Sequence, residues 1–257
     1  MVVVNMVGVE GAVAADYVFK SKPDGSIVFW YHEAMLGNYY TDVSPLNWYD
    51  FTPACMVIVS PRVTLTRANM PWKNLKEALK DAKANPKKYA IGFGTGGVAY
   101  FEYAGIEAIV PGALRAVPYE GGDTPRITAL LGGHIDLAMV GLPSAIPYLK
   151  SGELKALAVH DTERIKLLPD VPTTVELGYK DYIFRLSNTF FFPPKTPKSI
   201  VDQFNSIIEK IANNPEFQKR MEEMNIIVDF RTGAALEEYW KAADENYRKL
   251  SGKGKNS

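Results

Sequence analysis

Three short segments of the chain combine small residues with an apolar run before them and a helical pattern after them. They are Gly94-Thr95-Gly96-Gly97, Glu120-Gly121-Gly122-Asp123-Thr124 and Gly141-Leu142-Pro143-Ser144. The first turn of a helix has amide donors without an intrahelical partner, and the helix dipole adds positive potential there. A loop with few side chains can therefore hold an anion by its backbone. Backbone and hydroxyl donors with few fixed cations favour a small carboxylate over a polyphosphate.

Each of these loops follows a predicted strand. Residues 89–93, 116–119 and 135–140 are strand-like apolar runs, and a helix is predicted after each loop. Repeated strand–helix units favour mainly parallel sheets with helices on both faces. Ligands bind in open α/β folds at the carboxyl ends of parallel strands. We therefore expect the three loops to meet at one edge of a sheet.

The rest of the chain carries further helix and strand signals. Asn74 and Glu77 predict the start of a helix, and Asn85-Pro86 predicts its end. The stripe expected to be buried on that helix is Leu75, Ala78, Leu79 and Ala82. The other predicted strands are 2–4, 27–30, 55–59, 63–66, 154–159 and 226–228, and the other predicted helices are 12–19, 143–150, 199–212, 215–224 and 234–250.

Composition excludes several classes of function. The 257 residues include 29 lysines and arginines and 29 aspartates and glutamates, which argues against nucleic acid or an acidic membrane as the main partner. Cys55 is the single cysteine, so no internal disulfide can form. We expect it to be buried in a strand. His32, His134 and His160 are widely spaced, and we expect neither a metal nor a cofactor.

The first residues show no export signal. Met1 leads directly into Val2-Val3-Val4 without a basic segment, and no apolar run approaches the roughly 20 residues of a membrane helix. A strand at residue two with no preceding unit suggests a chain that has lost its true beginning.

An alternative interpretation is a nucleotide-dependent enzyme. Gly92, Gly94 and Gly97 fit the G-x-G-x-x-G pattern, and Glu120 ends the next strand near the position of a ribose-binding acid. Against this, Gly92 lies inside the strand, and we expect the following helix to be short and broken by Gly105 and Pro111. No acid–base pair is evident in the sequence, so we expect a protein that is not an enzyme. A regulator's effector domain is a further alternative, but it requires a DNA-binding domain.

The order of short motifs resembles the substrate-binding receptors of tripartite tricarboxylate transporters, the Bug family of periplasmic solute receptors. The resemblance covers essentially the whole chain. Its strongest landmarks are Val117-Pro118-Tyr119-Glu120-Gly121, Leu130-Leu131-Gly132-Gly133-His134-Ile135-Asp136 and Leu142-Pro143-Ser144-Ala145.

The resemblance implies a type II periplasmic-binding-protein fold, in which two α/β lobes with mainly parallel sheets close on a small organic acid about a hinge. Lobe I would comprise residues 1–66 and 189–257, and lobe II residues 67–188. Members of the family usually begin with another strand and glycine-rich loop, so an N-terminal strand–helix unit would be missing here.

The family holds a carboxylate largely through backbone amides, hydroxyls and waters. By position, the resemblance implies ligand contacts from Thr95, Gly96, Gly97, Tyr119, Gly121 and Gly122, and more weakly from His32, Glu33, Ser187 and Asn188. Arg126 and Arg185 could each neutralise a second carboxylate. A polar pair common in the family before Leu-Pro-Ser-Ala is Val140-Gly141 here. A side-chain contact from this pair is therefore not expected, and the ligand can differ from citrate.

The resemblance therefore implies a periplasmic or extracytoplasmic receptor. It would bind a di- or tricarboxylate or an aromatic acid and hand it to the membrane permease subunits of a tripartite tricarboxylate transporter. We expect a monomer without nucleic acid, metal or cofactor.

Overall fold

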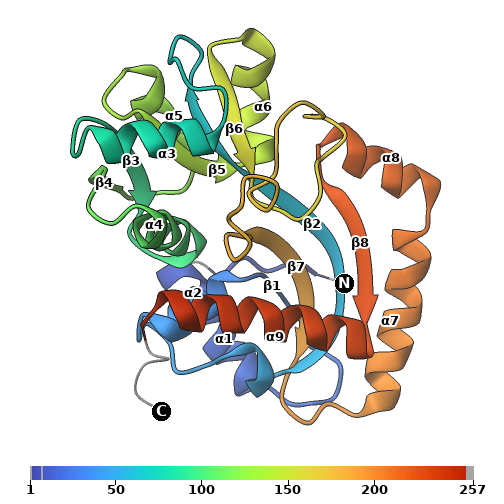
Figure 1. The fold of residues 1–257 in the computed structure, drawn as a ribbon. Coiled ribbons are helices and arrows are strands. Elements are labelled where there is room, and N and C mark those ends of the chain that lie inside the picture. The colour runs from blue at the N-terminus through green and yellow to red at the C-terminus, as the bar shows by residue number, and fades with distance from the viewer. Residues whose placement is uncertain (1, 7, 253–257) are drawn as a thin grey trace. The chain divides into compact units, whose positions relative to one another are not determined.

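The structure is a computed structural model, which describes residues 2–6 and 8–252. Its strands are β1 (Phe29–Tyr31), β2 (Thr52–Arg67), β3 (Ala90–Gly94), β4 (Arg115–Tyr119), β5 (Leu137–Gly141), β6 (Leu154–Val159), β7 (Arg185–Phe192) and β8 (Ile227–Thr232). Its helices are α1 (Ala12–Phe19), α2 (Ala34–Tyr40), α3 (Leu75–Ala84), α4 (Gly97–Ile109), α5 (Thr124–Leu131), α6 (Leu142–Ser151), α7 (Lys198–Ala212), α8 (Pro215–Glu223) and α9 (Gly233–Leu250), with short 3-10 turns η1 (Val9–Gly11) and η2 (Trp48–Asp50). Figure 1 labels the strands and the α-helices.

The chain divides into two compact units. Unit 1 comprises Met1–Val59 and Leu186–Ser257, and unit 2 comprises Ser60–Arg185. The chain changes unit inside β2 and again inside β7. An α/β fold was predicted, and the alternation of strands and helices in both units confirms it.

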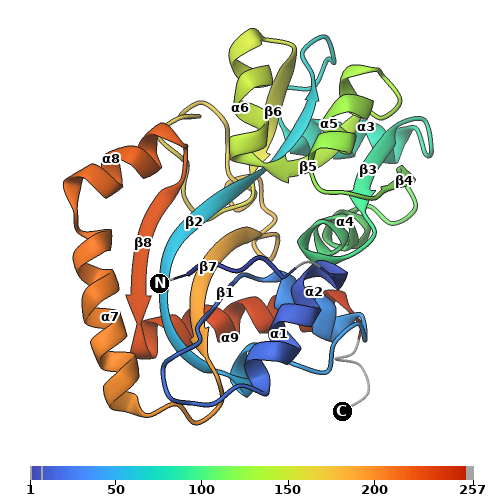
Figure 2. The ribbon, with the colours of Figure 1, turned by 180° about the vertical axis from the view of Figure 1, so that it is seen from behind.

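In unit 1, strands from both chain segments pair. β1 is antiparallel to β7, and the first half of β2 is antiparallel to β8. Helices α7 and α8 contact β8, as Figure 2 shows. Trp240 of α9 is fully buried, and its ring packs 5.2 Å from that of Phe191 of β7. Cys55 is buried in β2, as expected.

In unit 2, β3 lies between β5 and β4 and is parallel to both. The second half of β2 is antiparallel to β5 and to β6. The sheets are therefore mixed rather than mainly parallel, because β2 and β7 enter antiparallel pairs. The three strands that carry the glycine loops are the parallel ones.

Local signals agree with the structure at α3. The Asn74 side chain accepts a hydrogen bond from the Glu77 amide at 3.0 Å, and the Glu77 carboxylate accepts one from the Lys73 amide at 2.8 Å. The first bond satisfies an amide of the first turn that has no intrahelical partner, and the second holds the residue before the N-cap against the helix. The predicted stripe of Leu75, Ala78, Leu79 and Ala82 is buried.

Three predicted strands differ from the structure. Residues 2–4 form no strand, and their side chains are exposed. The runs 55–59 and 63–66 are not separate strands but parts of β2. Pro61 does not interrupt β2, because it falls between the stretch paired with β8, which ends at Val59, and the stretch paired with β5, which begins at Arg62.

The C-terminal predictions are confirmed. The three amphipathic helices are α7, α8 and α9, and the strand predicted at 226–228 is β8. Within residues 2–6 and 8–252, no helix combines the length and apolar character that crossing a membrane requires.

Candidate functional site

The three glycine loops meet at one edge of the sheet of unit 2. Gly94 is in register with Tyr119 across β3 and β4, and β5 runs parallel to β3 on its other side. All three strands therefore end at the same edge, and α4, α5 and α6 begin there. The predicted convergence of the loops is confirmed.

The β3–α4 loop has the geometry of an anion-binding helix start. Gly96 is extended, and no side chain caps the helix. Gly97 has a φ of 58°, which favours glycine. The Thr95 hydroxyl donates to the Glu120 carboxylate at 2.7 Å, so an acid lies beside this loop. The first-turn amides of α4 have no intrahelical partner.

The β4–α5 loop is open at its tip. Gly121 and Gly122 have φ values of 83° and 75°, and both are exposed. A Cβ at Gly122 would meet no atom within 4 Å. Tyr119 is half-buried, and its ring lies against Gly92.

Asp123 connects two of the loops. Its carboxylate accepts from Nη2 of Arg126 at 2.6 Å and from the Gly141 amide at 2.9 Å. Arg126 is buried, and its Nε donates to the Met139 carbonyl at 3.3 Å. The sequence prediction missed the role of Asp123; the signal available was an acid directly before a helix that starts Thr124-Pro125.

A buried polar network in unit 2 begins beside Asp123, whose Oδ1 lies 3.8 Å from Nη1 of Arg62. Arg62 donates to Glu102 through Nε at 2.8 Å and through Nη2 at 2.6 Å. His160 lies between Glu102, 2.9 Å from its Nδ1, and the Thr64 hydroxyl, 2.7 Å from its Nε2. The carboxylate accepts and the hydroxyl can donate, so this arrangement suits a neutral imidazole with its proton on Nδ1.

Charge and burial set the pKa values in this network. Burial alone would raise the pKa of Glu102, but Arg62 and His160 lower it to about 2. Burial lowers the pKa of His160, although Glu102 opposes this. The sequence prediction missed this network. Its only sequence signals were an arginine inside a β-branched run and a glutamate inside an apolar helix.

Four predicted site residues lie in unit 1. Glu33 is fully buried, and its carboxylate accepts from the Ser187 amide at 2.9 Å, from the Ser187 hydroxyl and from the Tyr239 hydroxyl at 2.5 Å. Burial raises the pKa of Glu33, and these donors only partly offset the effect. His32 is half-buried and accepts at Nδ1 from the Ala34 amide, while Asn188 is half-buried in β7. Glu33 and Ser187 are thus brought together by the protein's own bonds.

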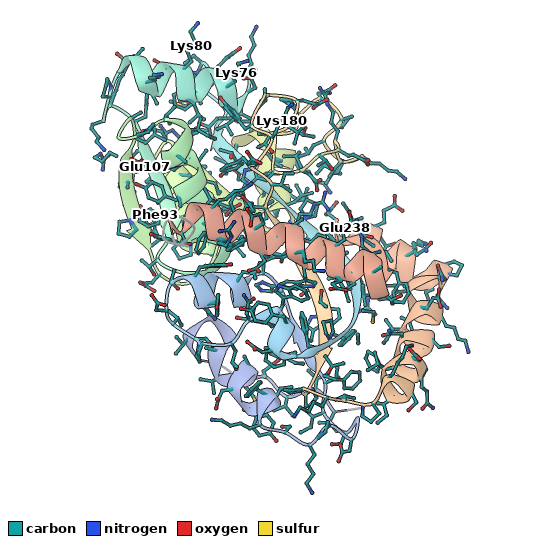
Figure 3. All side chains as sticks on the ribbon, turned by 60° about the horizontal axis from the view of Figure 1, so that its bottom comes forward. Lys76, Lys80, Phe93, Glu107, Lys180 and Glu238 are labelled. Carbon is teal, nitrogen blue, oxygen red and sulfur yellow. The ribbon has the colours of Figure 1, made fainter. Side chains whose placement is uncertain are left out.

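Aromatic side chains pack beside the β3–α4 loop. Phe93 of β3, labelled in Figure 3, stacks on Tyr103 of α4 with ring centroids 4.4 Å apart. Both rings are half-buried. Arg185, considered as a second anion-binding cation, forms an ion pair with Asp161.

Of the two objections to the dinucleotide interpretation, one agrees with the structure and one does not. Gly92 lies inside β3, as expected. A Cβ on Gly92 would lie 2.5 Å from Cδ1 of Ile135, so this glycine permits strand packing. The expected break at Gly105 is wrong, because α4 continues to Ile109. A Cβ on Gly105 would lie 2.8 Å from the Tyr182 ring, so this glycine admits that ring.

Comparison with solved structures places the fold among two-lobed periplasmic solute-binding proteins. A TctC solute-binding protein from Polaromonas shares 25% identity at a TM-score of 0.82, covering 97% of this chain and 86% of that one. MatC from Rhodopseudomonas palustris with bound malate shares 24% identity at a TM-score of 0.77, covering 96% of this chain and 86% of that one. An R. palustris protein with adipate shares 22% identity at a TM-score of 0.73, covering 94% of this chain and 83% of that one.

The sequence assigns the family. The model of the tripartite tricarboxylate transporter family receptor matches residues 1–249, and the chain belongs to this family. A UPF0065 protein from Agrobacterium vitis is 29% identical over 256 residues, 97% of this chain and 74% of the relative. The protein is accordingly a solute-binding receptor and not an enzyme, so the nucleotide-dependent alternative is set aside.

Proposed function

We propose that the protein captures a small organic carboxylate outside the cytoplasm and delivers it to the membrane permease subunits of a tripartite tricarboxylate transporter. Membership of the receptor family supports this proposal. The formal net charge is zero, with 29 basic and 29 acidic residues. A zero net charge suits a small-molecule receptor better than a nucleic-acid-binding protein.

The observation that carries the proposal is the convergence of the three loops on one sheet edge. At that edge α4 begins at Gly97 without a side-chain cap. Helix-start amides attract a carboxylate without a dedicated side chain. We propose that Thr95, Gly96, Gly97, Tyr119, Gly121 and Gly122 contact the ligand.

The unit 1 part of the proposal concerns His32, Glu33, Ser187 and Asn188. Because the Glu33 carboxylate is bonded to Ser187 and Tyr239, its proposed role is to hold Ser187 in place rather than to bind an anion itself. A second buried acid beside a carboxylate would repel it.

The two units are proposed to act as the lobes of a clamp. The predicted lobe boundaries at residues 66 and 188 fall within β2 and β7, the strands in which the chain changes unit. Ligand binding and closure would then form one coupled equilibrium. We further propose that the protein is periplasmic and monomeric. Size-exclusion chromatography with light scattering would test the monomeric state.

Ligand class is tested with a thermal-shift panel followed by calorimetry. The first probes are malate and adipate, which are bound by the two R. palustris proteins of the same fold, with citrate and benzoate beside them. NAD and ATP are the negative controls. We expect at least one carboxylate, and neither nucleotide, to raise the melting temperature. Stabilisation by nucleotides alone would contradict the proposal.

The location of the site is tested with two matched glycine variants. Gly97→Leu places a side chain at the start of α4, whereas Gly112→Leu places one in open space after the end of α4. Both positions have similar positive φ values, 58° and 66°, so the backbone strain is comparable. We expect carboxylate binding to be lost in Gly97→Leu and kept in Gly112→Leu. Equal affinities in the two variants would place the site elsewhere.

A further inference from the structure

Arg126 is a buried cation at the proposed site. It lies in the first turn of α5, and only 2% of its surface is exposed. Two of its three guanidinium nitrogens are bonded to the protein: Nη2 donates to Asp123 at 2.6 Å, and Nε to the Met139 carbonyl at 3.3 Å. Among the residues that the structure describes, Nη1 has no hydrogen-bond acceptor.

The unpartnered nitrogen faces the β3–α4 loop. A Cβ on Gly94 would lie 3.2 Å from Nη1 of Arg126 and 2.9 Å from Cβ of Ala99. Any other residue at position 94 would therefore crowd the guanidinium or the first turn of α4. The glycine leaves a donor of a fixed positive charge beside the loop that leads into α4.

We propose that Arg126 binds the ligand's carboxylate through Nη1, together with the helix-start amides of α4. Asp123 is the positioning residue, because it fixes the orientation of the guanidinium while leaving Nη1 unbonded. The inference rests on the proposed function and deepens it: the ligand is held by a formal charge as well as by backbone dipoles. A neutral solute of the same shape would lack this contact.

The burial of Arg126 supports a role beyond structure. Although the side chain as a whole is buried, Nη1 is not among the fully buried polar atoms without a partner, so this one nitrogen stays accessible to solvent or to a bound molecule. Asp123 and Met139 satisfy two sides of the group. A bound carboxylate oxygen would satisfy the third.

The test compares Arg126→Gln with Arg115→Gln. Arg115 is the exposed first residue of β4, at the opposite end of that strand from Tyr119, so both variants remove one charge from unit 2. Affinity is measured by calorimetry for malate, adipate, citrate and benzoate, and folding by circular dichroism. We expect Arg126→Gln to weaken the best of these ligands by about 10-fold or more, the effect of one charged hydrogen bond.

Each remaining outcome has a definite meaning. Equal affinities of Arg126→Gln and Arg115→Gln would overturn the role of Arg126 and leave the proposed function standing. If the wild-type protein binds no member of the panel, the proposed function fails, and this inference with it.

A second variant distinguishes ligand binding by Arg126 from a role of Arg126 in stabilising the fold alone. Arg126→Lys keeps the charge without the planar fork, and it replaces Arg126→Gln if the latter does not fold. We expect its affinity to lie between those of wild type and Arg126→Gln. Loss of thermal stability in Arg126→Lys with wild-type affinity would assign Arg126 to structure alone and overturn the proposal.

Discussion

The Arg62 guanidinium donates two hydrogen bonds to the Glu102 carboxylate in the interior of unit 2. Nε and Nη2 donate at 2.8 and 2.6 Å, and both side chains are nearly inaccessible to solvent. The two residues are 40 positions apart in the sequence. The pair joins β2 to α4, the helix whose first turn forms the proposed anion site.

Breaking this ion pair should strongly destabilise the protein. Glu102→Gln removes the nearer counter-charge of the buried Arg62 and leaves Asp123 at 3.8 Å, and we expect the free energy of unfolding to fall by about 3–5 kcal/mol. Urea denaturation measures the change. The control is Glu176→Gln, which breaks the exposed pair with Arg164 and should cost less than about 1 kcal/mol. Equal losses in the two variants would show that burial does not strengthen the pair.

Stability should fall as the solution is acidified. The folded-state pKa of His160 lies below its ordinary value of 6.5, and that of Glu102 is about 2, below its ordinary 4.5. Both groups therefore bind more protons in the unfolded state, so their contribution is present above the ordinary values and is lost as pH falls. Urea denaturation at a series of pH values tests this. His160→Gln should remove the loss of stability that begins as pH falls below about 6.5. If the unfolding free energy of this variant depends on pH as in the wild type, His160 is not the group responsible.

Removing a hydrogen-bond donor from the Glu33 carboxylate should destabilise the protein more at neutral than at acidic pH. Glu33 also contributes to stability with a pH dependence opposite to that of His160 and Glu102. Burial raises the pKa of Glu33 above its ordinary 4.5, so its contribution to stability is present below that value and is lost as pH rises through the folded-state pKa. Tyr239→Phe removes a hydrogen bond to this carboxylate, and we expect a loss of about 1–3 kcal/mol when Glu33 is ionised. The loss should shrink at acidic pH.

Urea denaturation of Tyr239→Phe at neutral and acidic pH makes the measurement. Tyr17→Phe in α1 is the control, since Tyr17 is about half exposed. A loss that is the same at both pH values would show that the Glu33 charge is not involved.

Neutralising Glu120 should strengthen carboxylate binding. Glu120 accepts from the Thr95 hydroxyl at the edge of the β3–α4 loop, so its negative charge opposes an anion there. We expect Glu120→Gln to raise affinity about two- to fivefold, the effect of one solvent-screened charge a few ångströms away. Calorimetry with the best ligand of the panel measures it. The exposed Glu163, changed to Gln, controls for net charge; weaker binding in Glu120→Gln would assign Glu120 a contact with the ligand.

Short-range patterns predicted the parts of the fold that depend on neighbouring residues. The start of α3, its buried stripe and the three C-terminal helices follow from capping and from apolar spacing. The three glycine loops were predicted in the same way, because a strand, small residues and a helix start succeed one another within a few positions.

The tertiary structure decided the features that join distant parts of the chain. Residues 55–59 and 63–66 proved to be one strand because successive stretches of β2 pair with β8 and with β5. Such pairing depends on partners far away in the sequence, which apolar runs do not identify.

The sequence by itself therefore determined the family, the alternation of elements and the glycine loops. Only the folded chain brought Asp123 to the Gly141 amide, Arg62 to Glu102, and the Nη1 of Arg126 to Gly94. The physical reason is that a charged side chain is stable in the interior only beside a partner, and that partner is supplied by a different strand, helix or loop.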